Sequence, residues 1–404
     1  MADLTKDLFT GAPKPQRPED WLQLDYLATQ LFTPHAPIDE EQLFAGRIDQ
    51  VELLVDSVLQ KGQHAILYGE RGVGKTSLAN LVKTRVLSHS PQYRVTKRNC
   101  TKELTFKQIW CQLLDDMQLD DLPLANELGE TPGPYEVYKA LDRFPINIRP
   151  IFIIDEYDRI EGDDTHIRMA DTIKYISDNS LDVTIIIIGV ADDVTQLFGG
   201  HPSIQRNVRQ IAMPLMSENE LHLLFDTRLR ELGMQMETEM QQFIVSLSQG
   251  LPGYAHLLGQ GAVRVAIERK QLTAEIGMMR KAMDRALRDC DERIQQLYET
   301  AVRSRKPNNL YRQAMLACAM AKISDRGYFT ANDVRSSFSK IMGSERDFQT
   351  INRHLKEFCE DDRGPGILRV GLPRSYEYKL SDALLRPFVV IKGLTEGIIT
   401  PEDL

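Results

Sequence analysis

Short apolar runs alternate with segments of helical periodicity between about residue 65 and residue 213. Three of the runs are nearly continuous in apolar residues, which is typical of strands buried on both faces of a parallel sheet. The pattern therefore predicts an α/β domain with helices on both faces of a parallel sheet, preceded by an amphipathic helix at Ile48 to Gln60. The predicted strands are AILY (65–68), YRVTK (93–97), RPIFIID (149–155), VTIIIIGV (183–190) and RQIAM (209–213).

After Pro214 the apolar spacing is helical and no strand pattern is found, which predicts a helical domain. The segment RKPNN (305–309) is predicted to be a linker. Prolines among polar residues near the N-terminus predict a mobile tail. The expected parts are a tail (1–20), the α/β domain (21–214), the helical domain (215–304), a last folded domain (305–392) and a tail (393–404).

The last domain has the order helix, helix, helix, hairpin. Leu310 to Lys322 is the first predicted helix, and Thr330 with Asp333 forms the start of the second, which runs to Lys340. The third helix spans Arg346 to Glu360, with Phe348, Ile351, Leu355 and Phe358 expected in the core, and the hairpin turns around Gly371 and Pro373. This order is typical of a winged helix-turn-helix.

The composition is that of a globular protein, with 42% hydrophobic and 26% charged residues. The net charge of −9 argues against a chain that coats nucleic acid along its whole length. The charge is unevenly distributed, however. Residues 305–392 hold 16 Lys and Arg against 10 Asp and Glu, a net +6, which leaves −15 for the remainder.

No run approaches the roughly 18 apolar residues of a membrane span, and the N-terminus has no signal-peptide pattern. We therefore expect a cytoplasmic protein with no membrane partner. The five cysteines are scattered singly and are expected to be reduced thiols.

The stretch Gly69 to Thr76 contains the complete pattern G-x-x-x-x-G-K-[ST] between a predicted strand and a predicted helix. Its glycines let backbone N–H groups surround a β-phosphate. Lys75 can reach the β- and γ-phosphates, and the Thr76 hydroxyl can ligate Mg²⁺. The predicted nucleotide-contact set of this loop is Gly69, Glu70, Arg71, Gly72, Val73, Gly74, Lys75, Thr76 and Ser77.

The run IFIIDEYD supplies the second half of this site. Four apolar residues form a buried strand, and Asp155 stands at its carboxyl end, where it can hold Mg²⁺ through water. Glu156 follows, placed to polarise an attacking water. The two motifs together predict binding of ATP and Mg²⁺.

The sequence resembles AAA+ ATPases of the origin-recognition-complex-like branch, a group that grades into STAND signalling ATPases and transposition-regulator ATPases. The resemblance covers about residues 40–392 and implies a P-loop (ASCE/AAA+) α/β domain, a helical lid and a C-terminal winged helix. It rests on the segments LFAGR (43–47), GERGVGKTS, IIDEYD, IIGVADD, HPSIQRNVRQIAMP and GLPGYAH, with the terminal helix and hairpin order.

The resemblance implies further site residues. Phe44, Gly46 and Arg47 would lie against the adenine and ribose. Arg206, or failing it Arg209, would be an arginine finger that reaches the γ-phosphate of a neighbouring subunit, which implies a homo-oligomer. Pro252, within Gly250-Leu251-Pro252, would begin the sensor-2 region of the lid.

Two positions depart from the family pattern. Asp192 stands where the family commonly has asparagine or a hydroxyl residue; alternatively it caps the helix that begins DDVTQLF. After Pro252 the family often has arginine, where this chain has Gly253, Tyr254, Ala255 and His256. His256 either contacts phosphate or packs within its helix. The lid without this arginine resembles the STAND type, whose members turn nucleotide over slowly, and a carboxylate at Asp192 would repel the γ-phosphate. Slow ATP hydrolysis is therefore predicted.

The third helix of the last domain has amides and cations on its outer face, where major-groove recognition needs them. The predicted DNA contacts are Gln349, Asn352, Arg353 and Lys356 on this helix and Arg369, Arg374 and Lys379 on the hairpin. A solvated helix face or a protein-binding winged helix remain open as alternatives.

These features predict an ATP-controlled switch that oligomerises and binds double-stranded DNA. The alternative is a STAND-like regulatory ATPase, for example in anti-phage defence, that controls a partner effector protein. An enzyme that uses ATP on a small substrate ranks last, because no second catalytic motif is found.

Overall fold

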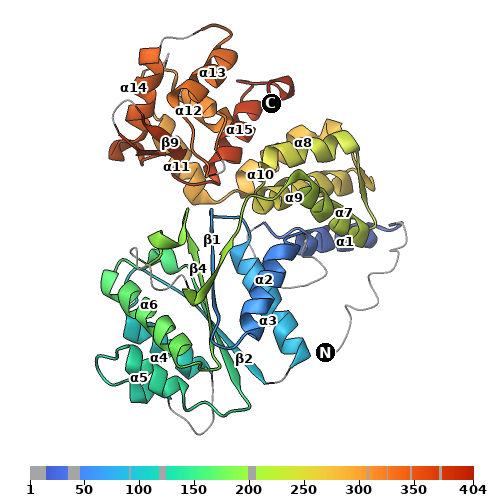
Figure 1. The fold of residues 1–404 in the computed structure, drawn as a ribbon. Helices are drawn as coiled ribbons and strands as arrows, with labels where there is room; N and C mark the ends of the chain where they lie inside the picture. Colours follow the sequence, from blue (N-terminus) through green and yellow to red (C-terminus); the bar gives the residue numbers. More distant parts are fainter. Residues whose placement is uncertain are drawn as a thin grey trace. The chain divides into compact units, whose positions relative to one another are not determined.

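The computed structural model describes residues 15–34, 46–90, 92–117, 124–198, 206–306, 309–324, 326–345, 348–372 and 375–404, without the side chains of 85–89. The chain divides into two compact units (Figure 1). Ala36–Leu215 is named the sheet unit here, and Met1–His35 together with Met216–Leu404 is named the helical unit.

The sheet unit contains five parallel strands in the order β2-β3-β4-β1-β5. Every predicted strand is present, with each end within two residues of the prediction, because continuous apolar runs mark buried strands clearly. The strands are β1 (His64–Gly69), β2 (Tyr93–Asn99), β3 (Arg149–Asp155), β4 (Thr184–Val190) and β5 (Val208–Ala212).

Helices cover both faces of the sheet, as predicted (Figure 1). α2 (Ile48–Leu59) and α3 (Lys75–His89) contact each other, and between them they contact β1, β2 and β5. The other face is covered by α4 (Phe106–Asp116), α5 (Pro134–Leu141) and α6 (Asp163–Asp178). Short 3₁₀ turns η2 (Leu124–Leu128), η3 (Tyr157–Arg159) and η4 (Val194–Gln196) complete this unit.

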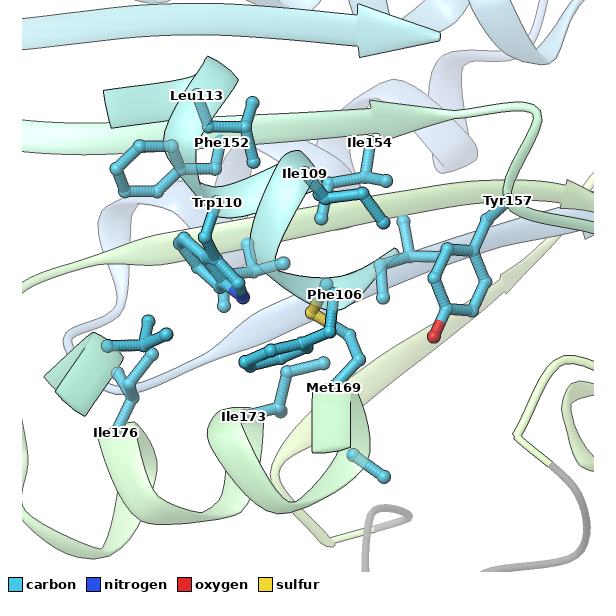
Figure 2. Packing of buried hydrophobic residues seen from close by; sticks show 14 of the residues in the cluster. Phe106, Ile109, Trp110, Leu113, Phe152, Ile154, Tyr157, Met169, Ile173 and Ile176 are labelled. Atoms are coloured by element: carbon cyan, nitrogen blue, oxygen red, sulfur yellow. The ribbon is translucent and has the colours of Figure 1, made fainter. Parts of the chain in front are cut away.

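The main core of the sheet unit lies under α4 and α6 (Figure 2). Trp110 is fully buried, with ring centroids 6.4 Å from Phe106 and 5.4 Å from Phe152. Phe152 and Ile154 of β3 belong to this core. Because side chains alternate along a strand, Asp155 points to the opposite face, the one that α3 covers.

His64 opens β1 with a fully buried imidazole whose Nδ1 accepts a hydrogen bond from the Ile185 N–H at 3.0 Å. Burial lowers the pKa of His64 to about 3. The unfolded chain has a histidine pKa of about 6.5, so stability that is present above pH 6.5 is lost as the pH falls toward 3.

We expect His64 to lower the free energy of unfolding by an amount that approaches about 1.4 kcal/mol per pH unit below 6.5. His64→Asn keeps a hydrogen-bond acceptor but does not titrate, and should therefore remove this part of the pH dependence. Urea unfolding at several pH values between 5 and 7 measures the slope, and equal slopes for the two proteins would exclude His64 as its source.

The helical unit begins with α1 (Pro18–Leu31) and continues after the sheet unit with predominantly helical structure. In the described parts of both units, no helix combines the length and apolar character needed to cross a membrane. The elements are α7 (Glu218–Leu232), α8 (Thr238–Ser248), α9 (Pro252–Glu268), η6 (Ile276–Met278), α10 (Met279–Asp289) and α11 (Glu292–Val302), with a short parallel pair, β6 (Gln235–Met236) and β7 (Thr273–Ala274).

α1 packs against α7 and α9, so residues 18–31 group with the helical unit rather than with the sheet. Arg264 forms two hydrogen bonds to Asp25, at 2.8 and 3.1 Å, and the Gln260 amide donates to the Phe32 carbonyl at 2.6 Å. Gly259 leaves the space that the Phe32 ring occupies, because a Cβ there would lie 2.6 Å from it. The predicted boundary at residue 21 placed most of this helix in the α/β domain, which differs from the observed grouping. Helical periodicity indicates that a helix forms but does not indicate which elements it packs against.

The C-terminal elements are α12 (Tyr311–Met320), α13 (Ala331–Met342), α14 (Phe348–Phe358), η7 (Asp361–Arg363), β8 (Ile367–Val370), β9 (Glu377–Leu380), α15 (Leu385–Thr395) and η8 (Pro401–Asp403). β8 and β9 form an antiparallel hairpin. Thr330 and Asp333 make the predicted reciprocal cap of α13.

Two predictions for this region are wrong. Phe348 is 42% exposed, and His354 takes the fourth core position of α14, because the buried stripe is rotated slightly around the helix toward His354. The prediction that residues 393–404 form a tail is also wrong, because residues 393–395 belong to a helix. α15 runs to Thr395 and packs on α10 and α12, with Gly393 against Leu316.

Candidate functional site

The loop between β1 and α3 has the backbone conformation that its glycines permit. Gly69, Gly72 and Gly74 have φ values of 144°, 82° and 96°, in the range that disfavours other residues. A Cβ on Gly69 would also lie 2.4 Å from the Met213 carbonyl oxygen. The side chain of Val73 is buried and that of Arg71 is exposed, so the loop offers its backbone, rather than an apolar pocket, to a ligand.

Lys75 is the first residue of α3 and is only 8% exposed. Its ammonium donates to the carbonyls of Gly69 at 2.9 Å and Glu70 at 2.8 Å. Burial lowers the pKa of Lys75 to about 8, although the nearby carboxylates of Asp158 and Asp155 oppose this shift. The ammonium therefore lies within the loop, where phosphate oxygens can replace the two carbonyls as acceptors.

Thr76 and Asp155 meet as predicted, from the start of α3 and the end of β3. The Thr76 hydroxyl donates to Asp155 Oδ2 at 2.9 Å, and the Glu156 N–H donates to Asp155 Oδ1 at 2.9 Å. A hydroxyl and a carboxylate are hard oxygen donors, and Mg²⁺ is commonly held by one or two such ligands together with phosphate oxygens and water. These residues therefore fit a magnesium ion that accompanies a nucleotide.

Glu156 follows β3 with a left-handed backbone, φ 55°, which turns the chain sharply. Its carboxylate is 40% exposed and lies 2.8 Å from Arg159 Nη1. Arg159 was missed by the sequence analysis, which gave no reason to connect the two side chains. An exposed pair of this kind is weak, so a bound water can compete for Glu156.

Asp158 and Lys97 were also missed. Asp158 Oδ1 accepts from the Val190 N–H at 2.8 Å and so ties the loop after β3 to the end of β4. Lys97 Nζ lies 3.0 Å from Asp155 Oδ2. The signal for Lys97 in the sequence was its charge inside the predicted strand YRVTK, and without the register of β2 against β3 its partner was not predictable.

Arg47 lies beside the loop, and its contact with the base and ribose stays a prediction. It is 5% exposed, and its Nη2 donates to the carbonyl of Pro214 and, at 3.5 Å, to that of Val73. Arg47 thus connects Pro214, near the end of the sheet unit, to Val73 in the loop between β1 and α3, which is named the phosphate loop. Gly46 precedes it with φ 73°. Phe44 lies outside the described residues.

The predicted capping role belongs to Asp193 instead of Asp192. Asp193 is the N-cap of η4 and accepts from the Thr195 N–H at 2.9 Å, whereas the Asp192 N–H donates to Gln196 Oε1 at 2.9 Å. Asp192 is half-buried and follows the carboxyl end of β4 by two residues. Its capping alternative is therefore wrong, because the helix starts one residue later.

The two candidate finger arginines differ in environment. Arg209 lies within β5, and its Nη1 is 3.4 Å from Asp56 Oδ2 of α2. Arg206 is exposed and precedes β5. Because Val208 pairs with His64 in the parallel register, Arg206 lies beyond the amino ends of these strands, whereas Gly69 ends β1 at its carboxyl end.

His256 belongs to the helical unit, on α9, which Pro252 begins. It is 3% exposed; Nδ1 accepts from the Thr33 N–H at 3.1 Å, and Nε2 lies 3.4 Å from Arg228 Nη2. Burial and the Arg228 charge keep the pKa of His256 well below its usual value. Both ring nitrogens are engaged, which supports the alternative of a packed helix histidine and not that of a phosphate contact.

The predicted DNA-contact residues that the structure describes lie on α14 and on the β8–β9 hairpin. Gln349, Arg353 and Lys356 are exposed on α14, and Asn352 is half-buried. On the hairpin, the Arg369 guanidinium lies 4.5 Å from the Tyr376 ring centroid and the Lys379 ammonium 5.2 Å from that of Tyr328. Arg374 lies outside the described residues.

Comparisons with known proteins agree with this geometry. Residues 58–198 match the family model described as an AAA domain, and this range contains both halves of the site. The ORC2 protein of Aeropyrum pernix, solved as ADPNP and ADP complexes, has a similar structure, with 14% identity, a TM-score of 0.52, and coverage of 91% of this chain and 98% of that one. The fold is that of the origin-recognition AAA+ ATPases.

Two further solved structures have a comparable similarity to this chain. The ORC1 protein of Aeropyrum pernix, solved in complex with DNA, has 16% identity and a TM-score of 0.50, and 90% of this chain and 95% of that chain are covered. A Walker-type ATPase of Pyrococcus abyssi, paby2304, has 16% identity and a TM-score of 0.51, with coverage of 89% and 99%. A search of curated proteins found no match. The AAA+ fold supports a nucleotide-binding function for this chain.

Proposed function

We propose that this protein is an ATP-driven switch that binds ATP with Mg²⁺, hydrolyses it slowly, assembles with copies of itself and binds double-stranded DNA. The observation that carries the proposal is the meeting of Lys75, Thr76, Asp155 and Glu156 at the carboxyl ends of β1 and β3. These are the groups that phosphoryl transfer to water requires: a phosphate cradle, oxygen ligands for a metal and a carboxylate that polarises water.

Each residue has a distinct role in this mechanism. The loop N–H groups and Lys75 bind and orient the phosphates, and Thr76 with Asp155 would hold Mg²⁺, whose charge offsets the charge of the transferring group. Glu156 accepts a proton from the attacking water once its carboxylate leaves Arg159. The remaining negative charge needs a further cation in the transition state.

We assign that cation to Arg206 of a neighbouring copy. Arg206 lies beyond the amino end of β5, whereas the phosphate-binding loop of the same subunit follows the carboxyl end of β1. The two therefore lie at opposite ends of the parallel strands. An arginine in this position can reach a γ-phosphate only in another subunit. Arg209 is the weaker candidate, because it already pairs with Asp56 of its own sheet unit.

Slow hydrolysis is supported by two features of the chain. Asp192 presents a carboxylate after β4, where it would repel the γ-phosphate unless it were protonated or screened by magnesium. No arginine follows Pro252 at the start of α9, where Gly253, Tyr254 and Ala255 stand. A lid without a phosphate-binding arginine stabilises the transition state less.

We propose that residues 215–304 act as the lid and residues 305–392 as a winged helix, with α14 as the recognition helix. α14 buries Ile351, His354, Leu355 and Phe358 and turns its amides and cations outward. This arrangement suits contact with base edges and phosphates in a major groove. The ORC1 protein of similar structure was solved in complex with DNA.

We expect the replacement of Arg353 and Lys356 by alanine to weaken DNA binding and to reduce its salt dependence, by roughly one unit of log–log slope for each lost phosphate contact. The matched control replaces Lys281 and Arg288 of α10, two exposed cations outside this surface. Fluorescence anisotropy with a duplex at several salt concentrations measures both slopes. An unchanged slope in the α14 variant would remove the DNA assignment.

One observation favours the second candidate, a regulator that controls a partner effector protein. The hairpin exposes Leu368 (46%), Val370 (40%) and Leu372 (73%) beside Arg369. Neighbouring apolar side chains of this kind are more typical of a protein contact than of a DNA-binding wing. Recovery of a specific protein from native cells, together with binding to DNA that does not depend on salt, would favour this candidate.

A further inference from the structure

The carboxylate of Asp155 has a cationic partner in addition to its expected neighbours. Asp155 is 3% exposed, and a buried carboxylate is stable only if nearby donors and charges compensate for lost water. Oδ1 accepts from the Glu156 N–H, and Oδ2 accepts from the Thr76 hydroxyl. The Lys97 ammonium lies 3.0 Å from the same Oδ2 atom, one of the two carboxylate oxygens that could ligate a metal ion.

The register of the sheet brings Lys97 to this position. β2 and β3 are parallel, with Lys97 opposite Ile153 and Asn99 opposite Asp155. Lys97 and Asp155 therefore point to the same face of the sheet, the one under α3. The ammonium also lies 3.4 Å from Asn80 Oδ1 of α3, and the lysine side chain is only 20% exposed.

We infer that Lys97 competes with the divalent cation for Asp155. The ammonium neutralises the buried carboxylate while no metal is bound, and it must withdraw from Oδ2 before a metal ion can use that atom. Two cations within a few ångströms of each other in a poorly hydrated site repel strongly. Lys97 therefore raises the Mg²⁺ concentration at which the site becomes occupied. This inference rests on the proposed nucleotide function and goes beyond it.

The test is a Mg²⁺ titration of nucleotide binding. At a fixed concentration of a fluorescent ATP analogue, we expect Lys97→Met to lower the Mg²⁺ midpoint by about tenfold or more, since one repelling charge is removed. Lys97→Arg keeps the cation and should stay near the wild type. Arg98→Met is the matched control, because it removes the adjacent cation of β2, which pairs with Asp116 rather than with Asp155.

Thermal unfolding without nucleotide gives an independent readout. In EDTA, Lys97→Met should melt below the wild type, because Asp155 loses its counter-ion. Added Mg²⁺ should then raise the melting temperature of Lys97→Met more than that of the wild type. Lys97→Gln, which keeps a hydrogen-bond donor without the charge, gives the same comparison if Lys97→Met folds poorly.

The outcomes separate this inference from the proposed function. Equal Mg²⁺ midpoints in wild type and Lys97→Met would overturn it, as would weaker nucleotide binding at saturating Mg²⁺, which would assign Lys97 to a phosphate instead. A wild-type protein that binds no nucleotide would refute the proposed function. In that case the nucleotide-free melting experiment still decides whether Lys97 and Mg²⁺ compete.

Discussion

Lys75→Ala should abolish measurable ATP binding, whereas Glu156→Gln should bind ATP normally and hydrolyse it about 10² to 10⁴ times more slowly. The first change removes a buried ammonium that lies within the phosphate loop. The second removes only the carboxylate that polarises water and keeps nearly the same shape. Equilibrium binding of a fluorescent ATP analogue and steady-state release of phosphate measure the two effects.

Lys83→Ala is the matched control for the lysine, since Lys83 lies on the same helix, outside the loop. It should leave both measurements unchanged. Normal turnover in Lys75→Ala or in Glu156→Gln would show that the site has been assigned to the wrong residues.

Arg206→Ala should lower turnover by about 10³-fold or more without changing the ATP affinity of the isolated subunit, because the guanidinium acts on another copy. Glu156→Gln keeps Arg206 but lacks the carboxylate that polarises the attacking water. An equimolar mixture of the two variants should be partly active, because some interfaces then combine an intact Arg206 with an intact Glu156. Phosphate release by each variant alone and by the mixture measures this complementation.

Arg209→Ala is the control for a general loss of positive charge, as its guanidinium pairs with Asp56 within the same unit. It should retain most of the turnover. A mixture no more active than the sum of its parts would exclude a site shared between subunits and would leave Arg206 without a catalytic role.

The sheet and the phosphate loop were predictable because their signals are local. Each strand is a short apolar run, and the glycines, Lys75 and Thr76 have a fixed spacing set by the geometry of one loop. Asp155 was predictable for the same reason, since it ends an apolar strand. The Thr330 and Asp333 cap depended only on neighbouring residues and is present, whereas the cap considered for Asp192 lies one residue later, at Asp193.

The remaining features depend on contacts between distant segments. Lys97 reaches Asp155 only through the register of β2 and β3, and Arg228 reaches His256 only through the packing of α7 on α9. Helical periodicity also gave the orientation of the buried stripe of α14 only approximately, so Phe348 was expected inside in place of His354. Residue spacing gives the face of a helix approximately and gives no information about its partner.

The attachment of α1 affects the order in which the chain can fold during synthesis. Arg228 is fully buried and donates to the carbonyl of Leu31 at 3.1 Å across 197 positions of sequence. At the usual rate of about 5 to 20 residues per second, α1 leaves the ribosome about ten seconds or more before α7 exists. α1 therefore has to wait, while the whole sheet unit is synthesised, for α7 and α9 before it can bury its apolar face.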